Sequence, residues 1–327
     1  MNIHTNDIGK SRGFIMGIAM IAVMLFHQHF VHDFPLSVLQ HTGHWGVDVF
    51  LFVSGYGVAH SILSKKNYLS KQEIARFYLR RIIRIFPAIG CFTILRLLAG
   101  DIDSLYSGLI CALGLNYWYI RYIYVLYALT PFFVYLIAKC SFNPKNFSYC
   151  IAGGCALILA LILISIGGLM MNNLGFAIAR LPVFLCGIHC YMWIGKIYKY
   201  NLVDIITAMM LLIISVLLVY KYDNEALFVR YYQYIFLVPA IVLFSSFIYR
   251  VKLLFPKFII RFVEIIGCIS LELYICHEYI FGKVVVCCFG YKGLVVAFSC
   301  SFIVAYFLHR ISLIVGNALK KSLSCRL

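Results

Sequence analysis

Long apolar runs recur along the whole of this chain, and they constrain its fold more than any other feature. A transmembrane helix needs about 20 consecutive, mostly apolar residues, and stretches of that length return throughout the sequence. Hydrophobic residues make up 63% of the 327 residues and charged residues only 12%, and the mean hydropathy is +0.94. This composition is typical of a polytopic membrane protein and excludes a soluble globular domain.

The hydropathy pattern predicts an all-α fold, a bundle of about ten transmembrane helices with one shorter segment. The predicted spans are 13–32, 45–63, 82–99, 120–138, 149–170, 177–195, 203–220, 231–249, 262–282 and 293–316. The shorter segment, 104–118, is interpreted as re-entrant or interfacial at the outer face. Because the linkers are short and no internal repeat is found, we expect a single transmembrane domain over 1–327. We expect no appended soluble domain and no cleaved signal peptide.

Basic residues between the spans set the predicted orientation. Lys and Arg number 28 against 12 Asp and Glu, which gives a net charge of +16. The basic residues occupy short loops, as the positive-inside rule expects of cytoplasmic loops, so we expect no nucleic-acid partner. The loop 65–84 carries seven of them and is therefore placed in the cytoplasm. Both termini then lie in the cytoplasm, and the chain is expected to be a multi-pass protein of the cell membrane.

Several ionisable side chains fall inside the predicted spans, where an unpaired charge costs on the order of several kcal/mol. The orientation puts His27, Asp48, Arg180 and His277 toward the outer ends of their helices and Glu272 at mid-depth. Such residues are candidates for function by default. The alternative for Arg180 is a structural role, paired with Asp48 or Glu272. The histidines that follow His27 lack the spacing of metal ligands, so no metal site is expected.

Three arginines lie at the cytoplasmic foot of the third span, in the segment "RFYLRRIIRIFP". Arg80 and Arg84 are four positions apart and Arg81 and Arg84 three, so a helix brings all three to one face. Guanidinium groups make bidentate contacts with phosphate, which favours a phosphate site. Anchoring to lipid headgroups is the alternative.

Six segments of the chain, in their order along it, resemble the acyltransferase-3 family of multispanning membrane acyltransferases. They are "RGFIMGIAMIAVMLFH", "GVDVFLFVSGYG", "FYLRRIIRIFPA", "WYIRYIYVLYALTP", "RLPVFLCGI" and "IGCISLELYICHE". The resemblance implies about ten helices with cytoplasmic ends. It also implies transfer of an acyl group, usually acetyl, from cytoplasmic acetyl-CoA to a hydroxyl of an extracytoplasmic or lipid-linked saccharide. The expected setting is the O-acetylation of exopolysaccharide, capsule or lipopolysaccharide.

The resemblance also assigns roles to individual residues. The family's first-helix histidine maps to His27, its second-helix aspartate to Asp48, and its RxxR pair to Arg81 and Arg84. We expect His27 to act as the general base, because an imidazole titrates near neutral pH. Asp48 would orient that ring and stabilise the imidazolium. The arginines, with Arg80, would hold the phosphates of acyl-CoA, a co-substrate; no permanently bound cofactor is expected.

One departure from the family pattern lies in the first span. Many members carry an arginine eleven residues before the histidine, where this chain has Met16, and Arg12 lies one turn earlier. We expect Arg12 to join the acyl-CoA site. Arg12 and His27 would be about 22 Å apart along a helix, and Arg84 is taken as a loop residue on the inner side. Donor and acceptor sites are therefore expected to be separated by much of the bilayer.

The acceptor side of the expected site rests on aromatic and charged residues near the outer face. Trp118 and Tyr119 could stack on a sugar, and an aromatic belt at the membrane surface is the alternative for both. Arg180, Glu272 and His277 are the expected supporting residues. The expected partners are acyl-CoA, a saccharide acceptor and membrane lipids. Direct transfer and a covalent acyl-enzyme are both open.

The rival interpretation is a polytopic transporter or flippase of a lipid-linked sugar, with the intramembrane charges along a permeation path. That class of protein predicts inverted repeats with broken helices in matching halves. No such repeat is found in the sequence, which therefore favours the acyltransferase.

Overall fold

The fold is built from α-helices, as the apolar pattern predicts. The computed structural model describes residues 2–3, 6–33, 36–65, 67, 70–141, 180–193, 198–199 and 248–324, with isolated positions between 203 and 244. Besides helices, these residues form one short antiparallel pair of strands, β1 (Asn2–Ile3) and β2 (Tyr198–Lys199). The all-α fold is therefore confirmed for the part of the chain that the structure describes.

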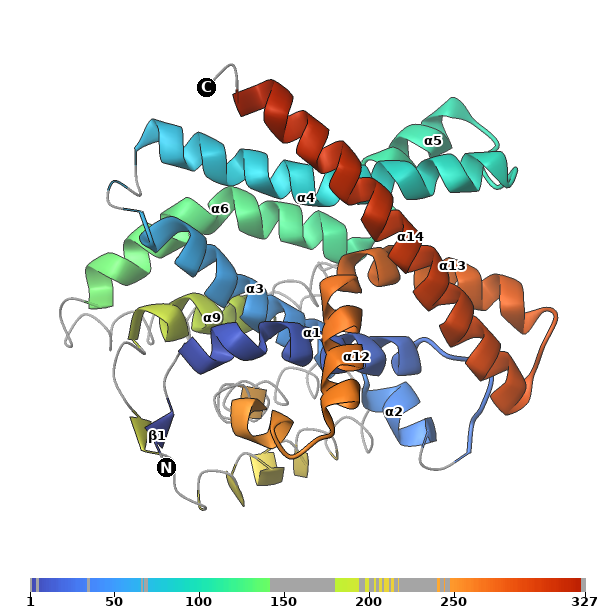
Figure 1. The fold of residues 1–327 in the computed structure, drawn as a ribbon, viewed down its shortest axis with the longest axis horizontal. Coiled ribbons are helices and arrows are strands. Elements are labelled where there is room, and N and C mark those ends of the chain that lie inside the picture. The colour runs from blue at the N-terminus through green and yellow to red at the C-terminus, as the bar shows by residue number, and fades with distance from the viewer. Residues whose placement is uncertain are drawn as a thin grey trace, which may run out of the picture. The chain divides into compact units, whose positions relative to one another are not determined.

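Ten helices have bounds within the described residues (Figure 1). They are α1 (Asn6–Phe26), α2 (Leu36–Thr42), α3 (Trp45–Leu63), α4 (Lys71–Leu98), α5 (Leu105–Ala112), α6 (Trp118–Ser141), α9 (Leu181–Trp193), α12 (Lys257–Cys268), α13 (Ser270–Val285) and α14 (Gly290–Ser324).

Four stretches among the described residues are helical, long enough and apolar enough to cross a bilayer. They are Ile8–Phe26, Trp45–Leu63, Trp118–Ile137 and Gly290–Ser322. The predicted span 149–170 lies outside the described residues, about half of 203–220 lies outside them, and 231–249 lies largely outside them. The count of ten spans therefore stays a prediction, as do the cytoplasmic termini.

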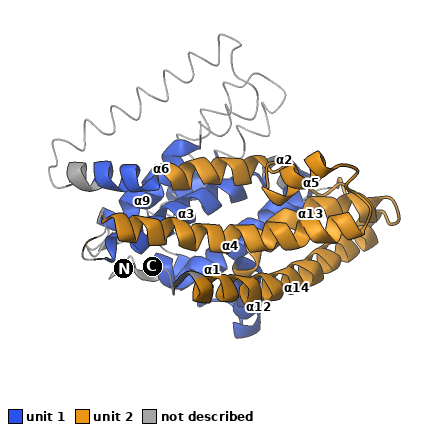
Figure 2. Cartoon of the chain, turned by 90° about the horizontal axis from the view of Figure 1, so that it is seen from above, with its two compact units in different colours: residues 1–26, 34–66, 130–267 blue, residues 27–33, 67–129, 268–327 orange. Residues whose placement is uncertain are grey.

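The chain divides into two compact units that are interleaved along the sequence (Figure 2). Unit 1 comprises residues 1–26, 34–66 and 130–267, and unit 2 comprises 27–33, 67–129 and 268–327. Unit 1 contains α1, α2, α3, α9 and α12; unit 2 contains α4, α5, α13 and α14; α6 contributes to both. The single domain over 1–327 stays a prediction.

Unit 1 is organised by the close packing of α3 and α9. The two helices cross at their glycines, and their chains run in the same direction. A Cβ added to Gly55 would lie 2.1 Å from the backbone oxygen of Phe184, and one added to Gly187 would lie 2.1 Å from that of Phe52. Each helix therefore presents a glycine to the other's backbone, as small residues do where membrane helices pack closely. The crossing fixes the register of the two helices.

Unit 2 is organised around α4, α13 and α14, which contact one another (Figure 1). Pro87 lies inside α4 and has no N–H to offer the carbonyl of Ile83, four residues earlier. On α14, a Cβ added to Gly316 would lie 3.5 Å from that Ile83 oxygen. The glycine thus lets α14 approach α4 at the turn where the proline removes a backbone hydrogen bond.

Three predicted boundaries are corrected by the structure. The first span, predicted as 13–32, is α1, which ends at Phe26, so His27 follows the helix. The helix predicted as the third span begins at Lys71, because the Ser70 hydroxyl accepts a hydrogen bond from the backbone N–H of Glu73 and caps the helix. Arg84 therefore lies in a helix and not in a loop. The span 262–282 is divided into α12 and α13 by a turn at Ile269.

The segment 104–118 contains one short helix. α5 has eight residues, which corresponds to about 12 Å, less than half the hydrocarbon thickness of about 30 Å. A turn with Gly114 at φ +70° follows it, and α6 then begins at Trp118. The length of α5 agrees with the prediction that this segment does not cross the bilayer by itself.

The α3–α9 crossing predicts a strong effect of a single methyl group. Gly55→Ala would force its Cβ against the Phe184 backbone, and overpacking of this kind costs roughly 1–3 kcal/mol. The free energy of unfolding, measured by denaturation in mixed micelles, should fall by that amount. Gly90→Ala is the matched control, since a Cβ there meets nothing within 4 Å. Equal stability of the two variants would contradict the crossing.

Candidate active site

His27 lies at the exit of α1, where the backbone is held by its neighbour Gln28. The buried Gln28 side chain accepts hydrogen bonds from the backbone N–H groups of Phe30 (2.9 Å) and Val31 (3.0 Å) and donates to the Val31 oxygen. The Phe30 ring contacts Phe281 of α13, with centroids 5.7 Å apart. The turn after α1 is therefore fixed against α13 within unit 2.

The imidazole of His27 is placed between two side chains of α13. Its Nδ1 lies 3.2 Å from Nε2 of His277, and its Nε2 lies 3.2 Å from Oε1 of Glu278. His277 is fully buried, whereas the side chain of Glu278 is 53% exposed. The structure thus brings together two residues predicted for the site, His27 and His277, and adds a carboxylate.

The backbone decides which nitrogens carry protons. Nδ1 of His277 lies 3.0 Å from the carbonyl oxygens of both Leu273 and Tyr274. A carbonyl only accepts, so this Nδ1 carries the proton, and Nε2 of the neutral ring is an acceptor. His27 must then donate from Nδ1 to His277, which leaves Nε2 of His27 as its basic nitrogen. The tautomer follows from this hydrogen-bond assignment.

Aromatic rings continue from this histidine pair to the start of α6. Tyr274 contacts His277, with ring centroids 5.8 Å apart, and Tyr119 contacts Tyr274 at 5.2 Å. Trp118 lies edge-on to Tyr119 at 6.0 Å. The two aromatic residues predicted near the acceptor are therefore linked by ring contacts to His277. Their role in sugar binding stays a prediction.

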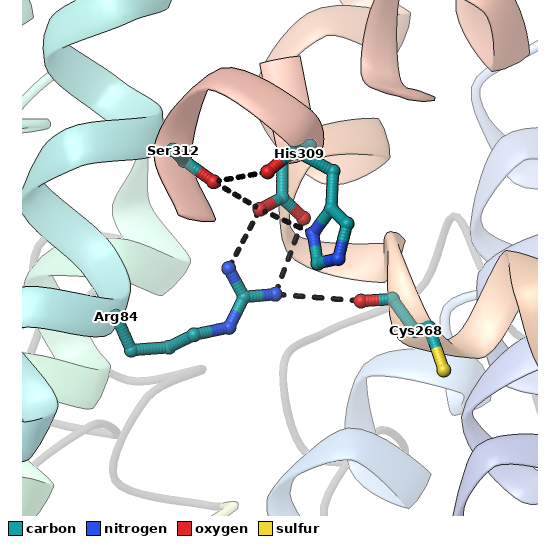
Figure 3. A network of polar contacts seen from close by, with 5 residues as sticks. Arg84, Cys268, His309 and Ser312 are labelled. Atoms are coloured by element: carbon teal, nitrogen blue, oxygen red, sulfur yellow. Dashed lines mark hydrogen bonds and ion pairs between the residues drawn. The ribbon is translucent and has the colours of Figure 1, made fainter. Parts of the chain in front are cut away.

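Glu272 lies one and a half turns before His277 and is the centre of a buried polar network (Figure 3). Its two oxygens accept a forked pair of hydrogen bonds from Arg84, at 2.6 and 3.2 Å. His309 Nδ1 and the Ser312 hydroxyl, both on α14, lie 3.1 and 3.3 Å from the same carboxylate. A third hydrogen bond of Arg84 reaches the backbone oxygen of Cys268, at 3.5 Å. Side chains of α4 and α14 thus bond to one carboxylate of α13 that is fully buried.

This network links the basic segment of α4 to the helix that carries His277. Glu272 and His277 are five residues apart on α13, which is about 8 Å along the helix axis. Arg84 and His27 contact these two residues respectively. The expectation that Arg84 belongs to a loop is therefore wrong, because α4 extends through the basic segment. The separation of donor and acceptor sites stays a prediction.

The other predicted arginines lie in different surroundings. The guanidinium of Arg81 lies over the rings of Phe77 and Tyr127, 5.1 Å from each centroid, a cation–π arrangement that fixes its position. Arg80 is a helical residue of α4. In unit 1, Arg12 packs against α3, with its Cζ 3.6 Å from where a Cβ of Gly57 would be. Phosphate binding by these arginines stays a prediction.

Asp48 forms a buried ion pair with Arg180 in unit 1. The guanidinium Nε donates to Oδ1 at 2.9 Å, and the exposed fractions of the two side chains are 6% for Arg180 and 0% for Asp48. Each residue lies seven positions before the glycine of its segment that makes the α3–α9 crossing, so the crossing sets them opposite each other. Asp48 is one of the two partners predicted for Arg180, and this pairing is confirmed; the role of Arg180 stays a prediction. A contact of Asp48 with His27 stays a prediction.

Asp101 holds the loop after α4 against α13. It accepts hydrogen bonds from Lys283 Nζ, at 2.7 Å, and from the Tyr279 hydroxyl. The hydrogen bond from Lys283, and then that from Tyr279, hold the pKa of Asp101 below its ordinary 3.8. The Arg96 guanidinium lies 5.5 Å from the centre of the Tyr279 ring. This cluster fixes the part of α13 that follows the histidine.

Sequence reasoning missed three members of these clusters. Glu278 follows His277 directly, and its position beside a predicted site residue was the available signal. His309 and Ser312 lie on α14, three residues apart, and a histidine inside a predicted span was the signal for the first. A serine within an apolar helix gives no comparable signal.

Comparison with known proteins supplies one match. A family model described as an acyltransferase domain matches residues 15–311. Neither the curated proteins nor the solved structures contain a match to this chain. The matched range includes His27, Asp48, the basic segment of α4 and the whole of α13.

The Asp48–Arg180 pair predicts a large loss of stability when one partner is removed. Asp48→Asn leaves a buried guanidinium without that carboxylate, and breaking a buried ion pair costs roughly 3–5 kcal/mol. Denaturation in mixed micelles measures the loss. The double variant Asp48→Asn with Arg180→Gln should recover part of it, because no buried charge then remains at the pair. A strictly additive double variant would contradict the pairing.

The Asp101 cluster predicts an acid-sensitive loop. Because the pKa of the folded carboxylate lies below 3.8, its contribution to stability is present above 3.8 and is lost as the pH falls through the lower value. Hydrogen exchange of the amides in 99–104 should therefore lose protection only below pH 3.8. Asp101→Asn should lower protection above pH 3.8 and remove this dependence. If protection in the variant depended on pH as it does in the wild type, the role of Asp101 in this loop would be contradicted.

Proposed function

This chain belongs to the acyltransferase-3 family of membrane acyltransferases, and from that premise we propose that it is an acyl-CoA-dependent O-acetyltransferase. The acetyl group passes from cytoplasmic acetyl-CoA to a hydroxyl of an extracytoplasmic or lipid-linked saccharide. The proposed setting is the modification of exopolysaccharide, capsule or lipopolysaccharide at the cell membrane. Acetyl-CoA is a co-substrate in this proposal, and no permanently bound cofactor takes part.

The placement of His27 is the single observation that carries the proposal. Nε2 of His277 accepts a hydrogen bond from Nδ1–H of this ring, at 3.2 Å, so the basic Nε2 of His27 faces away from the buried histidine. An imidazole with one nitrogen fixed and the other basic is the arrangement that general-base catalysis needs. The His27 side chain is 26% exposed, which supports access by a hydroxyl group.

The proposed reaction needs one proton transfer and one bond exchange. Nε2 of His27 removes the proton of the acceptor hydroxyl as its oxygen attacks the thioester carbonyl carbon. The C–O bond forms, the C–S bond breaks, and the thiolate of CoA takes the proton from the imidazolium. The products are the acetyl ester and CoA, and no oxidant or reductant is required.

Glu278 is proposed to stabilise the imidazolium during this step. Its Oε1 lies 3.2 Å from Nε2 of His27, and a carboxylate beside a histidine favours the protonated ring. Its exposed side chain can turn aside as the hydroxyl reaches Nε2. Asp48, the carboxylate that the family pattern suggests for this role, remains in the proposed site as a supporting residue.

The phosphates of CoA are proposed to bind the arginines of α4. Arg81 is fixed over two aromatic rings, and the Arg84 side chain is 40% exposed although its fork is bonded to Glu272. A guanidinium that is already oriented loses little conformational entropy when it binds phosphate. Arg80, one residue from Arg81, is included because of the helical spacing of the three arginines, and Arg12 because it lies one turn before the family's arginine position at Met16.

The decisive experiment compares His27→Gln with the wild type in membranes supplied with labelled acetyl-CoA. Loss of a general base lowers a rate by about 10²–10⁴-fold, so incorporation of label into saccharide should fall at least 100-fold at equal protein level. His60→Gln is the matched control; His60 lies at the end of α3 in contact with the Tyr191 hydroxyl and should transfer label like the wild type.

Two outcomes of this experiment would contradict the proposal. Transfer by His27→Gln at the rate of the wild type would remove His27 from the base role. An active, folded wild-type preparation that puts no label into any saccharide would favour the transporter or flippase.

A further inference from the structure

The side chains of His27, His277 and Glu278 are also of the kinds that bind transition-metal ions. One ligand atom from each of His27, His277 and Glu278 lies within 4.8 Å of the other two. We propose that these residues form a zinc site, and that a bound zinc ion occupies the lone pair of the basic nitrogen of His27. The inference rests on the cluster itself and is independent of the acyl acceptor.

His277 is already oriented as a metal ligand. Its Nδ1 is bonded to the carbonyl oxygens of Leu273 and Tyr274, so the lone pair of Nε2 points into the cluster. Histidines that bind metals usually donate their other N–H to a carbonyl or carboxylate in this way. The ring is fully buried, and the Phe281 ring lies edge-on to it at 5.8 Å. A buried imidazole with its lone pair fixed loses little freedom when it binds an ion.

One ligand atom from each residue lies within 4.8 Å of the other two, so the cluster is wider than a tetrahedral site and must contract onto an ion. Zn–N bonds of 2.0–2.1 Å place tetrahedral ligand atoms about 3.3–3.4 Å apart. Nε2 of His277 lies 3.2 Å from a nitrogen of His27, and Oε1 of Glu278 lies 3.2 Å from the other nitrogen of that ring. A single ion needs one nitrogen of His27 to face both partners. A rotation of the ring, with movement of the exposed carboxylate, provides that arrangement.

The chemistry of the ligands selects the ion. Two imidazoles and one carboxylate suit zinc and neighbouring transition metals, whereas Mg²⁺ and Ca²⁺ prefer oxygen ligands alone. The carboxylate offsets one of the two charges of the ion. Three protein ligands leave the fourth tetrahedral position for water or another small oxygen ligand.

Zinc binding and general-base catalysis exclude each other at His27. The ring has two nitrogens: zinc takes one, and the proton moves to the other, so no basic lone pair remains. An ion in the site would therefore arrest acyl transfer without unfolding the protein. The cluster then provides a point at which metal availability controls the proposed activity.

The test measures zinc directly and does not depend on acyl transfer. Full-length protein, purified in detergent with a reductant and without a polyhistidine tag, is equilibrated with Zn²⁺ in the presence of excess Mg²⁺. Metal content and a competition titration with a chelating dye give stoichiometry and affinity. We expect one tight site in the wild type. Glu278→Gln and His277→Gln should weaken it by roughly tenfold or more, because even residues that only orient metal ligands contribute 10–100-fold.

Controls separate the cluster from background binding and from misfolding. His60→Gln removes a histidine outside the cluster and should keep the tight site. Glu278 is half exposed, so Glu278→Gln tests the site without disturbing the core, whatever His277→Gln does to folding. An unchanged site in Glu278→Gln, or no tight site in the wild type, overturns the zinc inference. Neither result bears on His27 as the base, which the labelling experiment decides.

Discussion

The structure depends on how it accommodates carboxylates inside an apolar helical bundle. A charge removed from water must be paired and hydrogen-bonded or it destabilises the fold. Glu272 meets this requirement with Arg84, His309 and Ser312, and Asp48 meets it with Arg180. Because the partners come from different segments, each carboxylate ties together elements that are distant in sequence.

Buried ion pairs of this kind contribute more to specificity than to net stability. Replacing a pair by apolar residues is often neutral, whereas removing one member is costly. The fork between Arg84 and Glu272 therefore selects one register of α4 against α13. The same holds in unit 1, where Asp48 and Arg180 match only when Gly55 and Gly187 lie at the crossing of α3 and α9. Close glycine contacts and charge pairing reinforce one register.

The position of His27 depends on where helix α1 ends. α1 ends at Phe26, and the Gln28 turn then directs His27 toward α13. Had the helix continued to residue 32, its own geometry would have set the direction of His27. Instead, the buried His277 fixes one nitrogen of the ring and Glu278 lies beside the other. Acid–base chemistry and metal binding compete for the same nitrogen.

Much of this could be predicted from the sequence. The apolar runs predict the helical class, and α3 matches its predicted span of 45–63 at both ends. The candidates His27 and His277 and a partner for Arg180 also follow from depth and spacing. These features depend on local composition and on helix periodicity, which a linear sequence carries.

Only the tertiary structure decided which ionisable groups meet. Depth alone allowed Arg180 to pair with Asp48 or Glu272, and the α3–α9 crossing selects Asp48. The contact of His27 with Glu278 and the His309 bond to Glu272 join residues more than 30 positions apart, and no periodicity links such residues. The sequence by itself determined the helices and the residues capable of chemistry. Packing determined their partners, because contacts between helices depend on rotation and register that hydropathy does not encode.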